Sequence, residues 1–186
     1  MTNIAVFASG SGSNYEAIQQ AINDGAINAT VKLVVTDKPN AYVIERAKKF
    51  GVDVLVLSPK DFDGKAAYEA AILAELQKLD VEWLVLAGYM RLVGPTLLGA
   101  YPNHIVNIHP SLLPSFPGKD AIGQAMEHGV KITGVTVHYV DEGMDTGRII
   151  MQRAVDVIDG DREATEHKIH AVEHILYPEV LKFLFN

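Results

Sequence analysis

An asparagine, a histidine and a distant aspartate are the residues whose types and spacing best fit chemistry. Asn107 and His109 are two residues apart, and Pro110 directly follows the histidine. On an extended strand this spacing places both side chains on one face, and the proline ends the strand. Asp145 lies in an acidic loop flanked by glycines, from which its carboxylate could reach back to the histidine.

These three side chains would suit transfer of a formyl or acyl group from a carbonyl donor to an amine. Asn107 would donate a hydrogen bond to the oxyanion that forms when the amine attacks the carbonyl carbon. His109 would act as the general acid in its imidazolium form, and Asp145 would favour that charged form. The alternative interpretation is a structural histidine and a solvated turn aspartate.

The sequence favours neither a protein nucleophile nor a metal centre. It has no cysteine, and Ser111 does not lie in the Gly-x-Ser-x-Gly pattern of serine hydrolases. His167, His170 and His174 have the spacing of metal ligands on a helix, but no carboxylate set accompanies them. We therefore expect chemistry without a metal ion.

A glycine- and serine-rich segment, residues 9–14, separates the first apolar run from an amphipathic stretch. Open α/β sheets bind ligands where a strand ends and a helix begins, and the N–H groups of helix N-termini bind anions. Tyr15 occupies the position of the third glycine of a dinucleotide fingerprint, and a Walker loop is also absent. The segment predicts a monophosphate site, with a simple capped turn as the alternative.

Short apolar runs alternate with longer amphipathic stretches in the first half of the chain. The apolar runs are residues 4–8, 31–35, 52–57 and 83–87, and the helical stretches are 15–22, 41–50 and 66–79. This alternation predicts βαβ units in an α/β protein with a Rossmann-like open sheet. Because the runs are almost continuously apolar, helices are expected on both faces of a mostly parallel sheet.

The second half of the chain predicts a different arrangement. An apolar run at 105–108 precedes a proline-rich loop at 111–118 and a short helix at 121–128. Strands at 134–140 and 149–157 are joined by a short loop, which favours antiparallel pairing in the C-terminal part of the sheet.

A long helix is predicted for residues 162–185, with Asp161 as its N-cap and a kink or break before Pro178. No repeat, low-complexity segment or linker interrupts the pattern. We therefore expect residues 1–186 to form a single domain.

Composition and charge exclude several classes of function. The 186 residues include 16 Lys and Arg against 23 Asp and Glu, a net charge of −7. An acidic chain without a basic block is not expected to bind nucleic acid. No apolar run approaches the ~20 residues of a membrane helix, and no secretory signal opens the chain. We expect a cytoplasmic protein with small-molecule partners and no membrane partner; no heptad or large apolar stripe indicates an oligomeric interface.

Five segments resemble the folate-dependent formyltransferase superfamily and, within it, the glycinamide ribonucleotide transformylases (phosphoribosylglycinamide formyltransferases). They are residues 8–14 (ASGSGSN), 86–91 (LAGYMR), 107–114 (NIHPSLLP), 141–147 (DEGMDTG) and 173–178 (EHILYP). The Asn-x-His-x-Ser-Leu-Leu-Pro motif is similar to that of the superfamily. Residues 9–14 and the Glu-His-x-x-Tyr-Pro ending narrow the resemblance to the glycinamide ribonucleotide transformylases. The resemblance covers the chain from Ile4 to about Leu184.

The resemblance implies a single formyltransferase domain that transfers formyl from 10-formyltetrahydrofolate to the amine of glycinamide ribonucleotide (GAR) in purine synthesis. It implies that the catalytic residues are Asn107, His109 and Asp145. It implies GAR contacts from Gly12, Ser13, Asn14, His170 and Glu173. It implies folate contacts from Lys65, Met90, Arg91, Leu92, Val93 and Asn107, and no metal cofactor.

Three other functions share part of this pattern. A methionyl-tRNA formyltransferase would need a further C-terminal domain, for which the chain has no room. A formyltetrahydrofolate hydrolase would carry an N-terminal regulatory domain, whereas the first strand here begins at Asn3. A non-enzymatic nucleotide- or folate-binding module would need residues 9–14 but would have no use for the Asn107, His109 and Asp145 arrangement.

Overall fold

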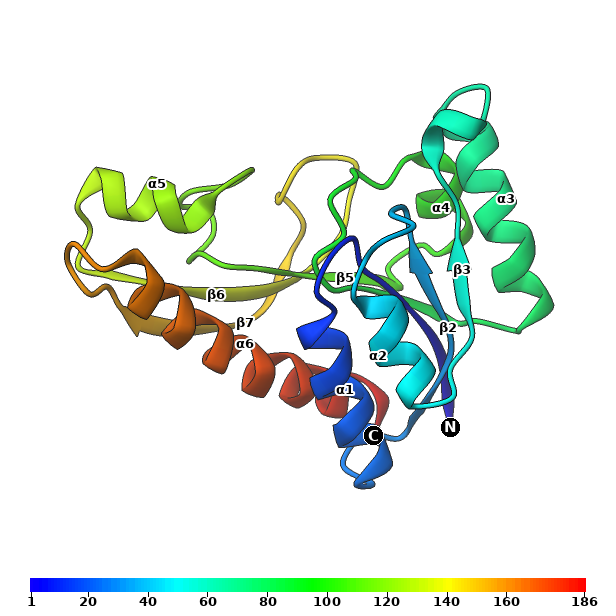
Figure 1. Cartoon of the computed structure of the whole chain (residues 1–186), viewed down its shortest axis with the longest axis horizontal. Helices are drawn as coiled ribbons and strands as arrows, with labels where there is room; N and C mark the ends of the chain where they lie inside the picture. Colours follow the sequence, from blue (N-terminus) through cyan, green and yellow to red (C-terminus); the bar gives the residue numbers. More distant parts are fainter.

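A seven-stranded mixed sheet in the order β3-β2-β1-β4-β5-β6-β7 forms the centre of the molecule (Figure 1). The computed structural model describes all of residues 1–186. Its strands are β1 (Thr2–Phe7), β2 (Ala29–Thr36), β3 (Val54–Val56), β4 (Trp83–Leu86), β5 (Ile105–His109), β6 (Ile132–Tyr139) and β7 (Ile149–Asp156). Strands β1 to β5 pair in parallel, whereas β5–β6 and β6–β7 are antiparallel, which confirms the predicted sheet.

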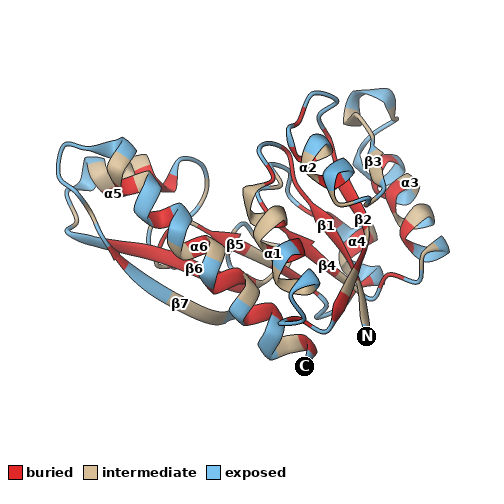
Figure 2. Ribbon diagram, turned by 60° about the horizontal axis from the view of Figure 1, so that its bottom comes forward, coloured by how far each residue is buried: buried red, intermediate tan, exposed pale blue.

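Helices cover both faces of this sheet, as predicted. They are α1 (Ser13–Asn23), α2 (Val43–Lys49), α3 (Lys65–Lys78), α4 (Pro95–Ala100), α5 (Ala121–His128) and α6 (Arg162–Phe185), with a 3-10 turn at Pro59–Asp61. Side chains of α1, α2, α5 and α6 form one apolar core with the sheet, and those of α3 and α4 form a second. Figure 2 shows the buried residues concentrated along the central strands and the inner sides of these helices.

The direction in which the strands are added reverses between β1 and β4. Strand β1 pairs with β2 on one side and with β4 on the other, so the loops that follow β1 and β4 lie next to each other. The Ser9 N–H donates to the carbonyl of Gly88 (3.0 Å), and the Met90 N–H donates to Ser9 Oγ (2.8 Å). The predicted phosphate segment and the predicted folate segment therefore meet at the position where open sheets bind ligands.

Helix α4 has no counterpart in the sequence prediction. Its first turn is capped from α3, because the buried Glu69 carboxylate accepts from the N–H groups of Gly94 (2.7 Å) and Leu97 (3.2 Å). A cap supplied from another helix stabilises a helix of only six residues, and local sequence carries no signal for it.

Helix α6 continues through Pro178, so of the predicted kink or break, the break is wrong. On either side of the proline, Leu176, Tyr177, Val180 and Leu181 are buried, and their packing holds both parts of the helix in place. The hydroxyl of Tyr177 donates to the carbonyl of Leu86 (2.7 Å) and lies 3.3 Å from that of Val106. The remaining boundaries agree with the predictions to within two residues.

Candidate active site

Strand β5 presents Asn107 and His109 on one face of the sheet. Val106 and Ile108 belong to the core on the opposite face, as the period of two in a strand requires. Both polar residues have partners on β6, where Asn107 lies opposite His138 and His109 lies opposite Thr136. The two side chains are thus held on a central strand with neighbours on both sides.

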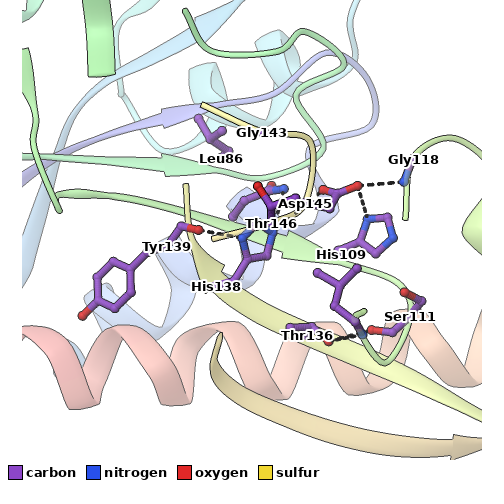
Figure 3. Close-up of polar contacts among 12 residues, drawn as sticks. Leu86, His109, Ser111, Gly118, Thr136, His138, Tyr139, Gly143, Asp145 and Thr146 are labelled. Atoms are coloured by element: carbon purple, nitrogen blue, oxygen red, sulfur yellow. Dashed lines mark hydrogen bonds and ion pairs between the residues drawn. The ribbon is translucent and has the colours of Figure 1, made fainter. Parts of the chain in front are cut away.

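The imidazole of His109 is buried and lies between two oxygen atoms, of which that of Asp145 is drawn in Figure 3. Its Nε2–H donates to the carbonyl of Phe116 (2.9 Å), and its Nδ1 lies 3.6 Å from Asp145 Oδ2. Asp145 is fixed in turn by the N–H of Gly118, which donates to the same oxygen (2.8 Å). Each ring nitrogen of His109 thus faces an oxygen atom.

A second histidine, His138, lies beside Asn107 and was not singled out by the sequence. It is 2% exposed, and its Nδ1–H donates to the carbonyl of Tyr139 (2.7 Å). Its Nε2 lies 3.5 Å from Asn107 Nδ2 and 3.9 Å from Asp145 Oδ1. Burial is the main influence on its pKa, which is lowered, so the neutral ring is favoured.

The proline-rich loop after His109 is tied down by side chains of β6 and β7. Thr136 Oγ1 donates to the carbonyl of Ser111 (2.7 Å) and accepts from the N–H of Leu113 (3.1 Å). Gln152 on β7 donates to the carbonyl of Leu113 (2.9 Å). These bonds fix the turn that carries Phe116, the partner of His109.

The acidic loop that carries Asp145 has its own internal hydrogen bonds. Asp141 Oδ1 accepts from Thr146 Oγ1 (2.6 Å) and from the N–H of Gly143 (3.0 Å). The Thr146 bond is the main cause of a lowered pKa at Asp141. Asp145 itself has a positive φ of 58°, an uncommon conformation for a residue other than glycine.

The N-terminus of α1 is open, as a phosphate site requires. Gly12 precedes the helix with a φ of 77°, and no side chain caps it. A Cβ added to Gly12 would lie 2.5 Å from Val43 Cγ2 on α2, so this position needs glycine for both conformation and packing. The first-turn N–H groups that follow can therefore face a ligand.

Helix α2 supports this loop through Arg46. Its Nε–H donates to the carbonyl of Ser11 (2.8 Å), and its Nη2 lies 3.3 Å from Ser11 Oγ. Arg46 also pairs with Glu16, which is 2.7 Å from Lys49 Nζ. The sequence analysis did not find Arg46, because a basic residue in a helix has many roles that sequence cannot separate.

The residues expected to contact GAR gather where α1 meets α6. Asn14 Nδ2 donates to Glu173 Oε1 (3.2 Å), and His170 Nδ1 donates to the same oxygen (2.9 Å). This hydrogen bond with Glu173 is the main cause of a raised pKa at His170. His174, a further residue that was not predicted, has its Nε2 3.1 Å from Ser13 Oγ.

A cavity of about 430 Å³ adjoins these residues. It is lined by Ser13, Glu163, Glu166, His167, His170, Ala171 and His174. The structure holds no group of three or more His, Cys, Asp or Glu side chains placed to bind a metal ion, the histidines on α6 included. The cavity lies directly beside the open end of α1, through Ser13.

Residues 90–93, expected to contact folate, follow one another after β4, but not all of them expose a side chain. Met90 and Arg91 are exposed and Leu92 is 43% exposed, whereas Val93 is 4% exposed and belongs to the second core. Lys65 is the first residue of α3, and a Cβ added to Gly94 would lie 2.9 Å from its Cε. Val93 can therefore offer a ligand little beyond its backbone groups.

Comparison with known proteins is decisive for the family. The family model described as Formyl transferase matches residues 2–181. The chain belongs to the formyl transferase family. This formyl transferase is 54% identical over 187 residues to phosphoribosylglycinamide formyltransferase of Bacillus subtilis (strain 168), covering 100% of this chain and 96% of the relative. It is 37% identical over 182 residues to the Escherichia coli (strain K12) protein of the same name, covering 97% and 86%.

Solved structures agree with this assignment. The crystal structure of glycinamide ribonucleotide transformylase 1 from Geobacillus kaustophilus superposes with a TM-score of 0.97 at 59% identity, covering 100% of both chains. The formyl transferase is thus an enzyme of the transferase class with this fold. None of its helices combines the length and the apolar character that crossing a membrane would require.

Proposed function

We propose that this formyl transferase moves the formyl group of 10-formyltetrahydrofolate to the amine of GAR in de novo purine (IMP) synthesis. The observation that carries the proposal is the open N-terminus of α1 next to Asn14, His170 and Glu173. A phosphate suits the helix terminus, and a carboxylate beside it suits ribose hydroxyls. The names of the relatives support the same acceptor.

The amine nitrogen of GAR attacks the formyl carbon, and a new C–N bond forms while the carbonyl electrons move to oxygen. Asn107 donates a hydrogen bond to this oxyanion, and His109 stabilises it as an imidazolium. The bond from the formyl carbon to N10 of the folate then breaks. His109 acts as the general acid, so the proton lost by the amine is balanced by the proton gained at N10.

Asp145 has an electrostatic role in this mechanism. Its carboxylate lies 3.6 Å from His109 Nδ1 and keeps the ring charged without touching the substrates. The chemistry as written needs no metal, because the charge on the oxyanion is met by Asn107 and His109.

The donor is assigned to residues 90–93 and Lys65. Met90 and Leu92 offer apolar side chains, backbone groups offer polar contacts to a pterin ring, and Lys65 offers a charge. Asn107 would contact the formyl group of the donor. The Ser9 bond to the Met90 N–H supports the proposal that donor and acceptor meet at this edge of the sheet.

The proposal places the whole activity in a single domain, residues 1–186, acting on small molecules in the cytoplasm. All the proposed site residues come from one sheet, its loops and three of its helices, which supports one catalytic unit. The net charge of −7 argues against a nucleic-acid partner.

The test is consumption of 10-formyltetrahydrofolate with and without GAR. Donor loss that depends on GAR, with formyl-GAR as product, is the expected result. Equal loss without GAR would instead support a hydrolase, and no loss in either case would support a binding module.

A further inference from the structure

His138 is a buried titratable group that the proposed mechanism does not use. It lies opposite Asn107 on β6, and its Nε2 faces both Asn107 and Asp145. Figure 3 shows its ring beside the acidic loop, with the bond to Tyr139 drawn. A buried ring in this position limits the hydrogen bonds that Asn107 and Asp145 can make.

The hydrogen bond to Tyr139 determines which ring nitrogen carries the proton. A carbonyl oxygen only accepts, so His138 Nδ1 is the donor in the 2.7 Å contact. Burial at 2% exposure disfavours a second proton on the ring. His138 Nε2 is then an acceptor with a lone pair directed at its neighbours.

This acceptor decides how the Asn107 amide is turned. The amide oxygen would meet the Nε2 lone pair unfavourably, whereas the amide nitrogen can donate to it over the observed 3.5 Å. One N–H of Asn107 is thereby committed to His138. The other N–H remains for the substrate, on the strand face shared with His109.

We propose that His138 is a positioning residue that holds the Asn107 amide with its nitrogen, and not its oxygen, toward the reacting carbonyl. This inference rests on the proposed function, in which Asn107 donates to the oxyanion. An inverted amide would present an oxygen to that oxyanion and would repel it. His138 thus selects the catalytic orientation of a side chain whose two orientations have nearly the same shape.

Because His138 is neutral, it does not compete with His109 for the negatively charged carboxylate of Asp145. The groups that face His138 are Asp145, His109 and Asp141. If its Nε2 carried a proton, that N–H would point at Asp145 Oδ1, now 3.9 Å away, and would compete with His109 for the carboxylate. It would also lose the hydrogen bond from Asn107.

The first test reads the tautomer directly and does not depend on activity. Nitrogen-15 NMR of histidine-labelled enzyme should show His138 neutral at neutral pH, with the proton on Nδ1. A proton on Nε2, or a charged ring, would overturn the proposal because the Asn107 amide would no longer be directed.

The second test uses two variants, each of which keeps a hydrogen-bonding group near the position of one ring nitrogen of His138. His138→Gln places an amide oxygen near the position of Nε2 and keeps an acceptor for Asn107. His138→Asn keeps a donor near the position of Nδ1 for Tyr139 but removes that acceptor. We expect kcat to fall roughly tenfold to a hundredfold in His138→Asn and much less in His138→Gln, with both KM values little changed. Equal losses in the two variants, or an unchanged kcat in His138→Asn, would overturn the proposal.

A double-mutant cycle separates positioning from general damage. In an Asn107→Ala background, His138→Asn should lower kcat by less than about twofold, because the group that it positions is gone. A full, additive loss in that background would mean that His138 does not act through Asn107. Thermal unfolding of each variant checks that the fold is retained.

Failure of the proposed function can be told apart from failure of this inference. If the wild-type enzyme consumes donor without forming formyl-GAR, the proposed function fails. The NMR measurement would still decide the orientation of Asn107, and the two variants would then be compared on the reaction actually observed.

Discussion

Asn14 and Glu173 are 159 residues apart in the sequence and are joined by a hydrogen bond from Nδ2 to Oε1 of 3.2 Å. The same Glu173 oxygen accepts from His170, while Asn14 Oδ1 is buried without a partner. Both side chains belong to the residues proposed to contact GAR, so this bond holds the two helices of the proposed acceptor site together.

GAR binding should weaken as pH rises through the raised pKa of His170. Glu173 raises that pKa, so the charged ring is present at lower pH, where it attracts the phosphate. The same contact stabilises the fold below the ordinary histidine pKa and ceases to do so above the raised one. Because the His170 side chain is half exposed, this contribution to stability is small.

Calorimetric titration of GAR at several pH values measures this effect, with His170→Gln as the matched control. In the variant, the effect of the second ionisation of the GAR phosphate, near pH ~6, remains, and it strengthens binding as pH rises. Wild type and variant with parallel pH profiles would exclude His170 from the phosphate site.

Asp145→Asn should lower kcat by two or more orders of magnitude, on the order of what an oxyanion contact contributes, with both KM values little changed. The amide oxygen can still accept from the Gly118 N–H, so the loop keeps its shape while His109 loses its carboxylate. Steady-state kinetics in both substrates give the measurement.

The double variant His109→Ala with Asp145→Asn tests whether the two residues act as a unit. It should be only slightly slower than His109→Ala alone, since Asp145 has no other catalytic role in the mechanism. Fully additive losses in kcat would contradict the proposed role of Asp145.

Variants at Gly12 and Ser13 distinguish the effect of packing from the effect of phosphate binding. Gly12→Ala should lower the free energy of unfolding by about 1–3 kcal/mol, because its Cβ would collide with Val43 and its φ is positive. Ser13→Asp should leave that free energy nearly unchanged and raise the KM for GAR by about tenfold or more, since a carboxylate at the open helix end repels the phosphate.

Denaturant unfolding and GAR kinetics on both variants provide the measurements, with the KM for the folate donor as internal control. A normal KM for GAR in a folded Ser13→Asp enzyme would place the phosphate elsewhere.

Leu92 and Val93 make a second matched pair, on the folate side. Leu92→Ala should raise the KM for the donor severalfold without a change in stability, because its side chain is 43% exposed. Val93→Ala should lower the free energy of unfolding by about 1–3 kcal/mol, because its side chain fills the core. The reverse pattern in donor kinetics and denaturant unfolding would contradict the assignment of these two side chains.

Most of the fold could be predicted because the strands and helices have clear periodicity. The apolar runs that became β1 to β5 are short and bounded by turn residues, which is the signal of a buried parallel strand. Helix α4 could not be predicted, because its cap comes from Glu69 on α3. The continuity of α6 through Pro178 was also hidden, since it depends on tertiary packing around Tyr177.

The site residues also divide into those that could be predicted from the sequence and those that could not. Asn107 and His109 could be found because strand spacing and the following proline are local features of the sequence. His138 could not, because its position opposite Asn107 depends on the register of β5 with β6. Val93 looked like its neighbours 90–92 in sequence, and only the packing of α4 shows that its side chain turns inward.

In the proposed mechanism, Tyr177 would give α6 a second role, as a spacer between the two substrates. Its hydroxyl bonds to the carbonyl of Leu86, and lies close to that of Val106, one residue before Asn107. One turn earlier, the same helix carries Glu173 at the proposed ribose site. In the proposed mechanism this helix would set the span from the bound sugar to the reacting carbon, and a shift of about 1 Å along its axis could slow the reaction ~100-fold.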